Sequence, residues 1–156
     1  MARQIPYIDT KVATRKTIAE VEELLEVHGA SAVAKKFEAG HVKAVMFEHN
    51  GVPFRLPANV EAIYQYLCTA RRKAPRSQYR YSEPPQAVKE SWFDQAERCA
   101  WRNVMYWVKA QLALVEIGMV TVTEVFLPYM LTSNDETLYQ KMLHEGLKAL
   151  PAGSEQ

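Results

Sequence analysis

The chain has 156 residues, of which 48% are hydrophobic and 24% charged, and its formal net charge is +1. This length suits a single domain whose core needs no metal or disulfide, and the near-neutral balance excludes recognition of nucleic acid by overall charge. Residues 1–10 lack the apolar run of a signal peptide, and no stretch approaches the roughly 18 apolar residues of a membrane span. We therefore expect a cytoplasmic protein with no membrane partner.

The N-terminal part predicts an arm followed by a helix. Residues 1–14 have a mixed composition and predict either an N-terminal arm or a disordered lead-in. Apolar residues then recur at helical spacing from Ile18 to Leu25, with glutamates at most other positions. Thr17 stands three residues before Glu20, the spacing of a capping box, and a glycine ends the pattern.

A change of period predicts three antiparallel strands. Residues 32–37 form the first and least regular of them, and residues 42–48 are apolar on adjacent as well as alternate positions, as in an inner strand. Asn50-Gly51 is a strong hairpin signal. Val52 to Leu56 then alternates, and Pro53 favours the edge of the sheet for this third strand.

Helices dominate the rest of the chain. A second helix is predicted from Val60 to about Ala70, and residues 71–85, with three prolines and no helical period, predict an exposed basic loop. A long helix follows over residues 91–118, capped by Ser91 and ended near Gly118. A short helix over residues 124–130, with Thr121 or Thr123 as its cap, a last amphipathic helix around residues 138–147 and a disordered tail over residues 151–156 complete the chain.

The long helix has only a narrow polar stripe, roughly 100° wide, so we expect it to be surrounded on most sides. Either the N-terminal half of the same chain covers its tryptophan-rich surface, or a second copy does, which leaves a homo-oligomer open. The element order indicates an α+β fold, with a single domain over residues 15–150.

The basic loop carries the best functional signal. Guanidinium and ammonium groups pair with phosphates, and tyrosine rings stack on unpaired bases. Two arginines on the polar stripe of the long helix, Arg98 and Arg102, extend the set. Asp94 lies four residues before Arg98, so an ordinary ion pair on the helix surface explains Arg98 equally well. The candidate nucleic-acid-binding residues are Arg71, Arg72, Lys73, Arg76, Tyr79, Arg80, Tyr81, Arg98 and Arg102.

No pattern of catalytic or metal-binding residues is visible. The four histidines lack zinc spacing, there is no Cys-x-x-Cys, and no glycine-rich phosphate loop occurs. Cys68 and Cys99 lie inside apolar helical patterns and are expected to be buried reduced thiols. We expect a protein that is not an enzyme, with no cofactor, no metal and no catalytic residue.

Two stretches carry a resemblance. Residues 17–25, which run into Gly29-Ala30, are one, and residues 101–118, followed by Glu124-Val125-Phe126-Leu127, are the other. Together they resemble a group of small uncharacterised proteins of phages, prophages and mobile elements. The resemblance implies a setting in a bacterial cell and carries over no activity and no functional residue.

The leading hypothesis is an accessory protein that binds nucleic acid, single-stranded or through the phosphate backbone, with the basic loop as its contact. The alternative is a protein-interaction module, either a homo-oligomer or a subunit or inhibitor of a larger complex. Its interface would be the tryptophan-rich long helix or the sheet edge at Val52 to Leu56.

Overall fold

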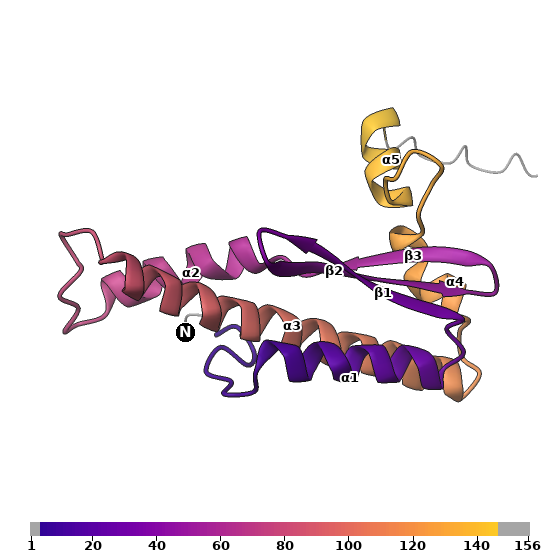
Figure 1. Cartoon of the computed structure of the whole chain (residues 1–156), viewed down its shortest axis with the longest axis horizontal. Coiled ribbons are helices and arrows are strands. Elements are labelled where there is room, and N and C mark those ends of the chain that lie inside the picture. The colour runs from indigo at the N-terminus through magenta and orange to yellow at the C-terminus, as the bar shows by residue number, and fades with distance from the viewer. Residues whose placement is uncertain (1–3, 147–156) are drawn as a thin grey trace, which may run out of the picture.

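A computed structural model describes residues 4–146 of the chain. Three strands follow one helix, and a long helix dominates the second half, which confirms the α+β fold (Figure 1). The elements in chain order are α1 (Thr14–Val27), β1 (Ala32–Glu38), β2 (His41–His49), β3 (Val52–Pro57), α2 (Val60–Lys73), α3 (Gln86–Glu116), α4 (Val122–Phe126), the 3-10 turn η1 (Leu127–Tyr129) and α5 (Leu138–Glu145).

The sheet is antiparallel and its strand order is β1-β2-β3. The predicted Asn50-Gly51 turn joins β2 to β3, and both turn residues have positive φ, 50° and 77°, as the tight hairpin turns require. A register shift between Lys36 and Phe37 interrupts the pairing of β1 with β2. Residues of β2 and β3 that face the body are buried, among them Val45, Phe54 and Leu56.

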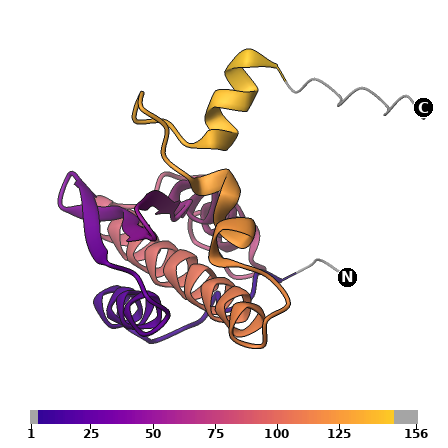
Figure 2. The same ribbon diagram turned by 90° about the vertical axis from the view of Figure 1, so that its right-hand side faces the viewer.

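Helix α3 is the centre of the molecule. The sheet covers one side of it, α1 lies along it, and α2 packs against its N-terminal part (Figures 1 and 2). Trp101 and Val108 are 0% exposed and Leu112 is 1% exposed. The prediction that this helix is surrounded is therefore confirmed, and the cover comes from the same chain.

Helix α3 begins five residues earlier than the sequence predicted. Its first residue is Gln86, directly after Pro85, and Ser91 is an exposed residue within the helix rather than its cap. Proline is disfavoured inside a helix but is accepted at its start, and no helix-breaking residue separates Gln86 from Ser91. The predicted stop is close, because the helix ends at Glu116 and Gly118 has a φ of 76°.

Two predictions for the N-terminal part are wrong. Helix α1 begins at Thr14, and Thr17 is a fully buried residue inside it, so the predicted capping box does not form. Residues 4–13 are not a disordered lead-in, because Ile8 is only 8% exposed and packs on the core. The side-chain amide of Gln95 donates hydrogen bonds to the carbonyl oxygens of Ile8 and Thr10, at 2.8 and 3.0 Å.

The C-terminal elements return to the sheet. Thr121, one of the two predicted caps, forms a capping box with Glu124 at the start of α4. The segment after η1 then runs beside β3, where the backbone N–H of Leu131 donates to the carbonyl of Pro53 at 2.8 Å. This segment covers part of the β3 edge, so the more open edge of the sheet is β1.

Helix α5 stands on the face of the sheet opposite to α3 (Figure 1). Its N-terminus has a capping box formed by Thr137 and Gln140. The predicted tail, residues 151–156, lies outside the described residues. Within residues 4–146 no helix combines the length and the apolarity that a bilayer crossing needs.

Candidate nucleic-acid interface

The basic segment lies at one end of the molecule, where α2 and α3 form a two-helix hairpin (Figure 1). Arg71, Arg72 and Lys73 belong to the last turn of α2, so the predicted loop boundary at residue 71 is wrong and the connection begins at Ala74. Cations are favoured at this position because the C-terminal end of a helix carries partial negative charge. We call residues 71–85, together with Lys89 and Trp92, the hairpin tip.

Trp92 is the residue on which the hairpin tip is built. It is 6% exposed and lies in the second turn of α3. The ring of Tyr79 meets it edge-on with 6.0 Å between the ring centres, and the guanidinium of Arg71 lies over it at 5.7 Å. These contacts fix one tyrosine and one arginine of the predicted set in supporting positions.

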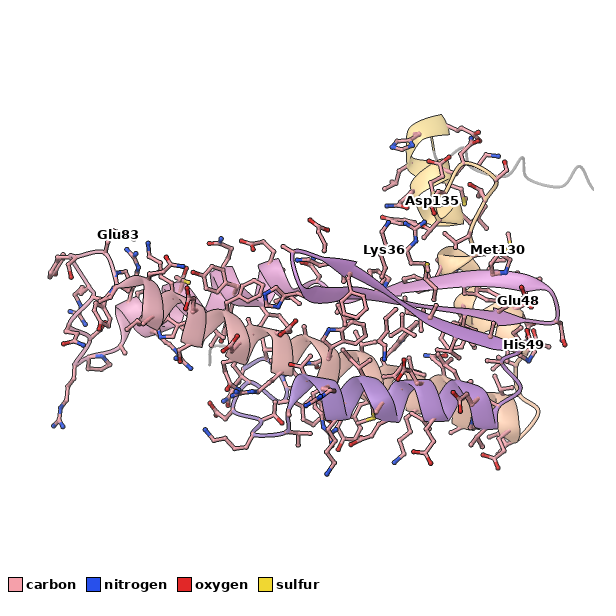
Figure 3. The ribbon with its side chains drawn as sticks, in the orientation of Figure 1. Lys36, Glu48, His49, Glu83, Met130 and Asp135 are labelled. Atoms are coloured by element: carbon pink, nitrogen blue, oxygen red, sulfur yellow. The ribbon has the colours of Figure 1, made fainter. Side chains whose placement is uncertain are left out.

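Glu83 ties the connection to both helices. Its carboxylate accepts a hydrogen bond from Arg72 at 2.7 Å, and its other oxygen lies 3.0 Å from the Lys89 ammonium (Figure 3). The hydrogen bond from Arg72, with a second from Lys89, holds the pKa of the Glu83 carboxyl below its ordinary value. The same bond raises the pKa of Arg72. Arg72 is therefore already paired within the chain.

Arg80 also has a structural role. Its guanidinium donates to the carbonyl oxygens of Ala74 and Lys73, at 3.1 and 3.4 Å. These carbonyl groups lie at the end of α2, where a helix leaves backbone acceptors without partners. Arg80 thus closes the end of the helix, and its charge stays close to the surface because the side chain is exposed.

Three residues of the hairpin tip remain available to a ligand. Lys73 and Arg76 are exposed and form no ion pair within residues 4–146, and Tyr81 is 95% exposed. The field around them is positive, because residues 71–90 contain six Lys and Arg side chains and two Glu, a formal charge of +4. The whole chain carries only +1, so the remaining residues sum to −3.

Arg98 and Arg102 do not join the hairpin tip. Arg102 lies ten residues beyond Trp92, about 15 Å along the helix axis. Its guanidinium donates to Glu20 of α1 at 2.9 Å and its side chain is only 14% exposed. Arg98 donates to the side-chain oxygen of Gln95, three residues earlier on α3, at 3.2 Å. Both arginines therefore have partners outside the hairpin tip.

Three residues of the hairpin tip were not among the predicted site residues: Glu83, Lys89 and Trp92. Lys89 and Trp92 were signalled by their spacing, because residues three apart on a helix share one face. Residues 86–90, which extend α3 before Ser91, bring Lys89 to the tip. These residues lay between the predicted loop and the predicted helix and were assigned to neither.

Other chemistry has weaker support in the described chain. Burial raises the pKa of the Cys99 thiol to about 11, as expected for an unreactive buried thiol, although Cys68 is only partly buried. His41 lies 3.2 Å from Glu97 beside the ring of Phe93, and no nucleophile is paired with it in residues 4–146. Within the same residues no group of three His, Cys, Asp or Glu side chains is arranged to hold a metal ion.

No protein-family model, no curated protein and no solved structure matches this chain. The resemblance to phage and mobile-element proteins therefore stays a prediction, and the function has to be argued from the site itself.

Proposed function

We propose that this protein is a non-enzymatic accessory protein that binds nucleic acid through the hairpin tip. The observation that supports it best is the exposure of Lys73, Arg76 and Tyr81 within one short stretch, residues 73–81, of a segment of charge +4 at the far end of a projecting helical hairpin. Ammonium and guanidinium groups pair with phosphates without reading sequence. An exposed tyrosine ring stacks on an unpaired base.

The arrangement favours single strands over duplexes. The Tyr81 side chain is 95% exposed, and a free aromatic ring adds affinity only where bases are unstacked. The ion pairs of Glu83 with Arg72 and Lys89 link the connection to α2 and to α3, and the three free side chains project from this linked segment. Contacts of this kind select a backbone and a strandedness rather than a base sequence.

The test is fluorescence anisotropy with labelled single-stranded and duplex oligonucleotides at low and at physiological salt. We expect the double variant Lys73→Ala, Arg76→Ala to bind about tenfold more weakly at low salt. For single strands, the slope of the logarithm of the affinity against the logarithm of the salt concentration should become shallower by roughly 1.4. Two phosphate contacts are lost, and each contributes about 0.7 to this slope. Tyr81→Ala should weaken single-strand binding more than duplex binding.

The matched control is Arg15→Ala, Lys16→Ala, which removes the same two charges from exposed positions of α1. This control should leave the affinity within about twofold. Arg71, Arg72 and Arg80 are poor choices for the test because their contacts hold the hairpin tip together. An absence of binding at low salt, or an equal loss in the control, would contradict the proposal.

A protein-interaction module remains the second candidate, and strand β1 favours it. All but one of its residues are exposed, including Phe37 at 61%, and β2 is its only strand partner in residues 4–146. An open strand of this kind can pair with a strand of another protein. Strand β1 is favoured over the tryptophan-rich helix for this interface, because Trp92 and Trp101 are buried within the chain.

A further inference from the structure

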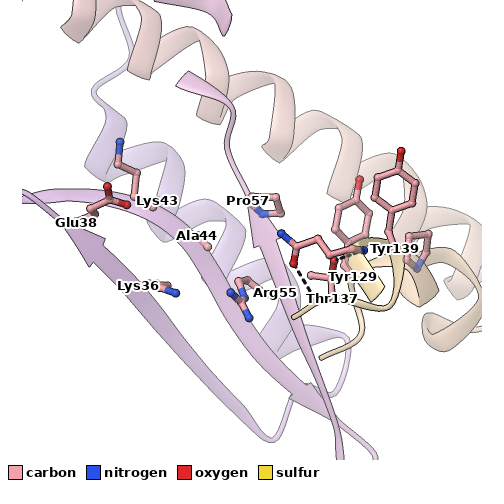
Figure 4. Close-up of a pocket in the computed structure, with 11 residues that line it drawn as sticks. Lys36, Glu38, Lys43, Ala44, Arg55, Pro57, Tyr129, Thr137 and Tyr139 are labelled. Atoms are coloured by element: carbon pink, nitrogen blue, oxygen red, sulfur yellow. Dashed lines mark hydrogen bonds between the residues drawn. The ribbon is translucent and has the colours of Figure 1, made fainter. Parts of the chain in front are cut away.

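A pocket of about 620 Å³ lies on the face of the sheet that α3 does not cover (Figure 4). Strands β1, β2 and β3 form its base, and η1 with the first turn of α5 forms its wall. Its volume falls in the range of small-molecule sites, which are mostly apolar with a few convergent polar groups. Ala44, Pro57 and Pro128 supply apolar lining. The hairpin tip lies away from this pocket, toward the opposite end of the molecule (Figure 1).

The pocket has two cationic side chains on the face of the sheet that α3 does not cover. Lys36 and Arg55 bring two positive charges, and Glu38 is the one carboxylate among the lining residues, whereas the Lys43 ammonium lies 6.0 Å from the ring centre of Phe93 on α3. The strand register places Lys36 and Arg55 on the same face of the sheet, because Lys36 pairs with Ala44 and Arg55 pairs with Met46, two residues further on. Lys36 is exposed and forms no ion pair within residues 4–146.

Arg55 is held in place before any ligand binds. Its side chain is 13% exposed, and its Nη2 group donates to the backbone carbonyl of Asp135 at 2.6 Å and to the Asp135 carboxylate at 2.8 Å. The hydrogen bonds of this guanidinium in the described chain all use Nη2, and its buried Nε has no partner there. A fixed guanidinium that is incompletely paired favours a carboxylate or a phosphate as its partner.

Two tyrosines line the side of the pocket opposite to Glu38 and Lys43 (Figure 4). Tyr129 is held by Trp107, whose ring meets it edge-on at 5.4 Å, while Tyr139 is 52% exposed. The capping box of α5 uses the backbone N–H and the side-chain oxygen of Gln140, which leaves its amide Nε2 as a donor beside the rings. Aromatic walls of this kind favour a planar ring.

We propose that this pocket binds a small organic anion that carries a planar ring, such as a mononucleotide or an aromatic carboxylate. The anionic group lies between Lys36 and Arg55, and the ring lies against Tyr139 and Tyr129. This site is separate from the hairpin tip and does not depend on the function proposed for it.

The experiment is an NMR titration of the full chain with AMP and with naphthoate, with adenosine and inorganic phosphate as the two half-ligands. We expect saturable binding of AMP or naphthoate, with amide shifts that cluster on β1, β3 and α5. Each half-ligand should bind at least tenfold more weakly than AMP. No saturable binding of either anion, or inorganic phosphate that binds as tightly as AMP and naphthoate, would overturn the proposal.

Variants then locate the site. Lys36→Met should weaken binding about tenfold, and Tyr139→Ala should weaken it by a similar factor, since both side chains are exposed and their loss spares the core. The matched control is Lys35→Met, the neighbouring lysine on β1, which points to the other face and pairs with Glu22 at 2.9 Å. It should leave the affinity unchanged. An equal loss in Lys35→Met and Lys36→Met would overturn the proposal.

A second control separates the pocket from the hairpin tip, because a mononucleotide also carries a phosphate. The variant Lys73→Ala, Arg76→Ala should bind AMP with unchanged affinity. If this variant loses AMP binding while Lys36→Met keeps it, the anion binds at the tip and the pocket proposal is overturned. If AMP binding survives although oligonucleotide binding fails, the pocket stands and the function proposed for the tip falls.

Discussion

Arg102 shows how one arginine can join two helices that are distant in sequence. Its Nη1 group donates to Glu20 at 2.9 Å and to the Thr17 hydroxyl at 3.4 Å, and its guanidinium lies 5.2 Å from the ring centre of Tyr106. The arginine side chain is 14% exposed and the glutamate side chain 33% exposed. Partial burial makes this pair stronger than a surface ion pair, and it makes an unpaired partner costly.

We predict that Arg102→Met lowers the free energy of unfolding by about 2 kcal/mol, because Glu20 is left without its partner while methionine keeps the apolar packing. Urea unfolding measures the change. Arg98→Met is the control, since Arg98 donates to the neutral Gln95 side chain three residues away on the same helix, and it should cost less than about 1 kcal/mol. Equal losses in the two variants would contradict a specific role for the pair with Glu20.

At the scale of elements, local sequence signals predicted the presence of helices and hairpins well, but they predicted the residues at which helices begin less well. The Asn50-Gly51 hairpin and the final helix followed from turn chemistry and spacing, which depend only on neighbouring residues. The start of α3 was wrong because Ser91 is a good cap in isolation, whereas Pro85 determines the start. The cap at Thr17 was wrong because this side chain is buried against another helix.

The candidate site was predictable in composition and not in geometry. The basic residues 71–80 and the two tyrosines are visible in the sequence. The ion pairs that occupy Arg72 and Arg102 reach across 11 and 82 residues, and no local pattern identifies such partners. For the same reason the pocket around Arg55 was not predicted. Its base comes from the three strands and its wall from η1 and α5, which lie far from the strands in the sequence.

Strand β3 offers a test of which side of the sheet carries the stability. We predict that Phe54→Ala lowers the free energy of unfolding by about 4 kcal/mol, because Phe54 is 0% exposed and its ring stacks on Phe47 at 4.9 Å. Phe37→Ala, on the exposed strand β1, should cost less than about 1 kcal/mol, since this side chain is 61% exposed. Urea unfolding of both variants gives the comparison, and similar losses would mean that Phe37 is covered in solution.

For the molecule as a whole, charge and length are arranged along one axis. Helix α3 has 31 residues and is about 46 Å long, so its N-terminal turns, with α2, reach beyond the sheet (Figure 1). The segment of charge +4 lies at this end, and the rest of the chain sums to −3. A positive end on a negative body directs a polyanion to the tip at low salt, and salt should weaken this steering.

The cover of α3 leads to a prediction about association. Its largest apolar side chains, Trp101 among them, pack against α1, α2 and the sheet of the same chain, so a folded chain requires no second copy to bury this helix. We therefore expect the midpoint of urea unfolding to stay constant over about a hundredfold range of protein concentration. If folding required a dimer, mass action would raise the apparent stability by roughly RT ln 100, about 2.7 kcal/mol, across that range.

A concentration-dependent midpoint would contradict a self-sufficient core. The variant Trp101→Ala separates this case from weak association through β1, because Trp101 is fully buried while β1 is mostly exposed. If α3 is covered within one chain, Trp101→Ala lowers the midpoint by the same amount at every concentration. Association through β1 alone would change the sedimentation of the folded protein with concentration. It would leave the effect of Trp101→Ala on unfolding the same, because Trp101 is buried in the core while β1 is exposed to solvent.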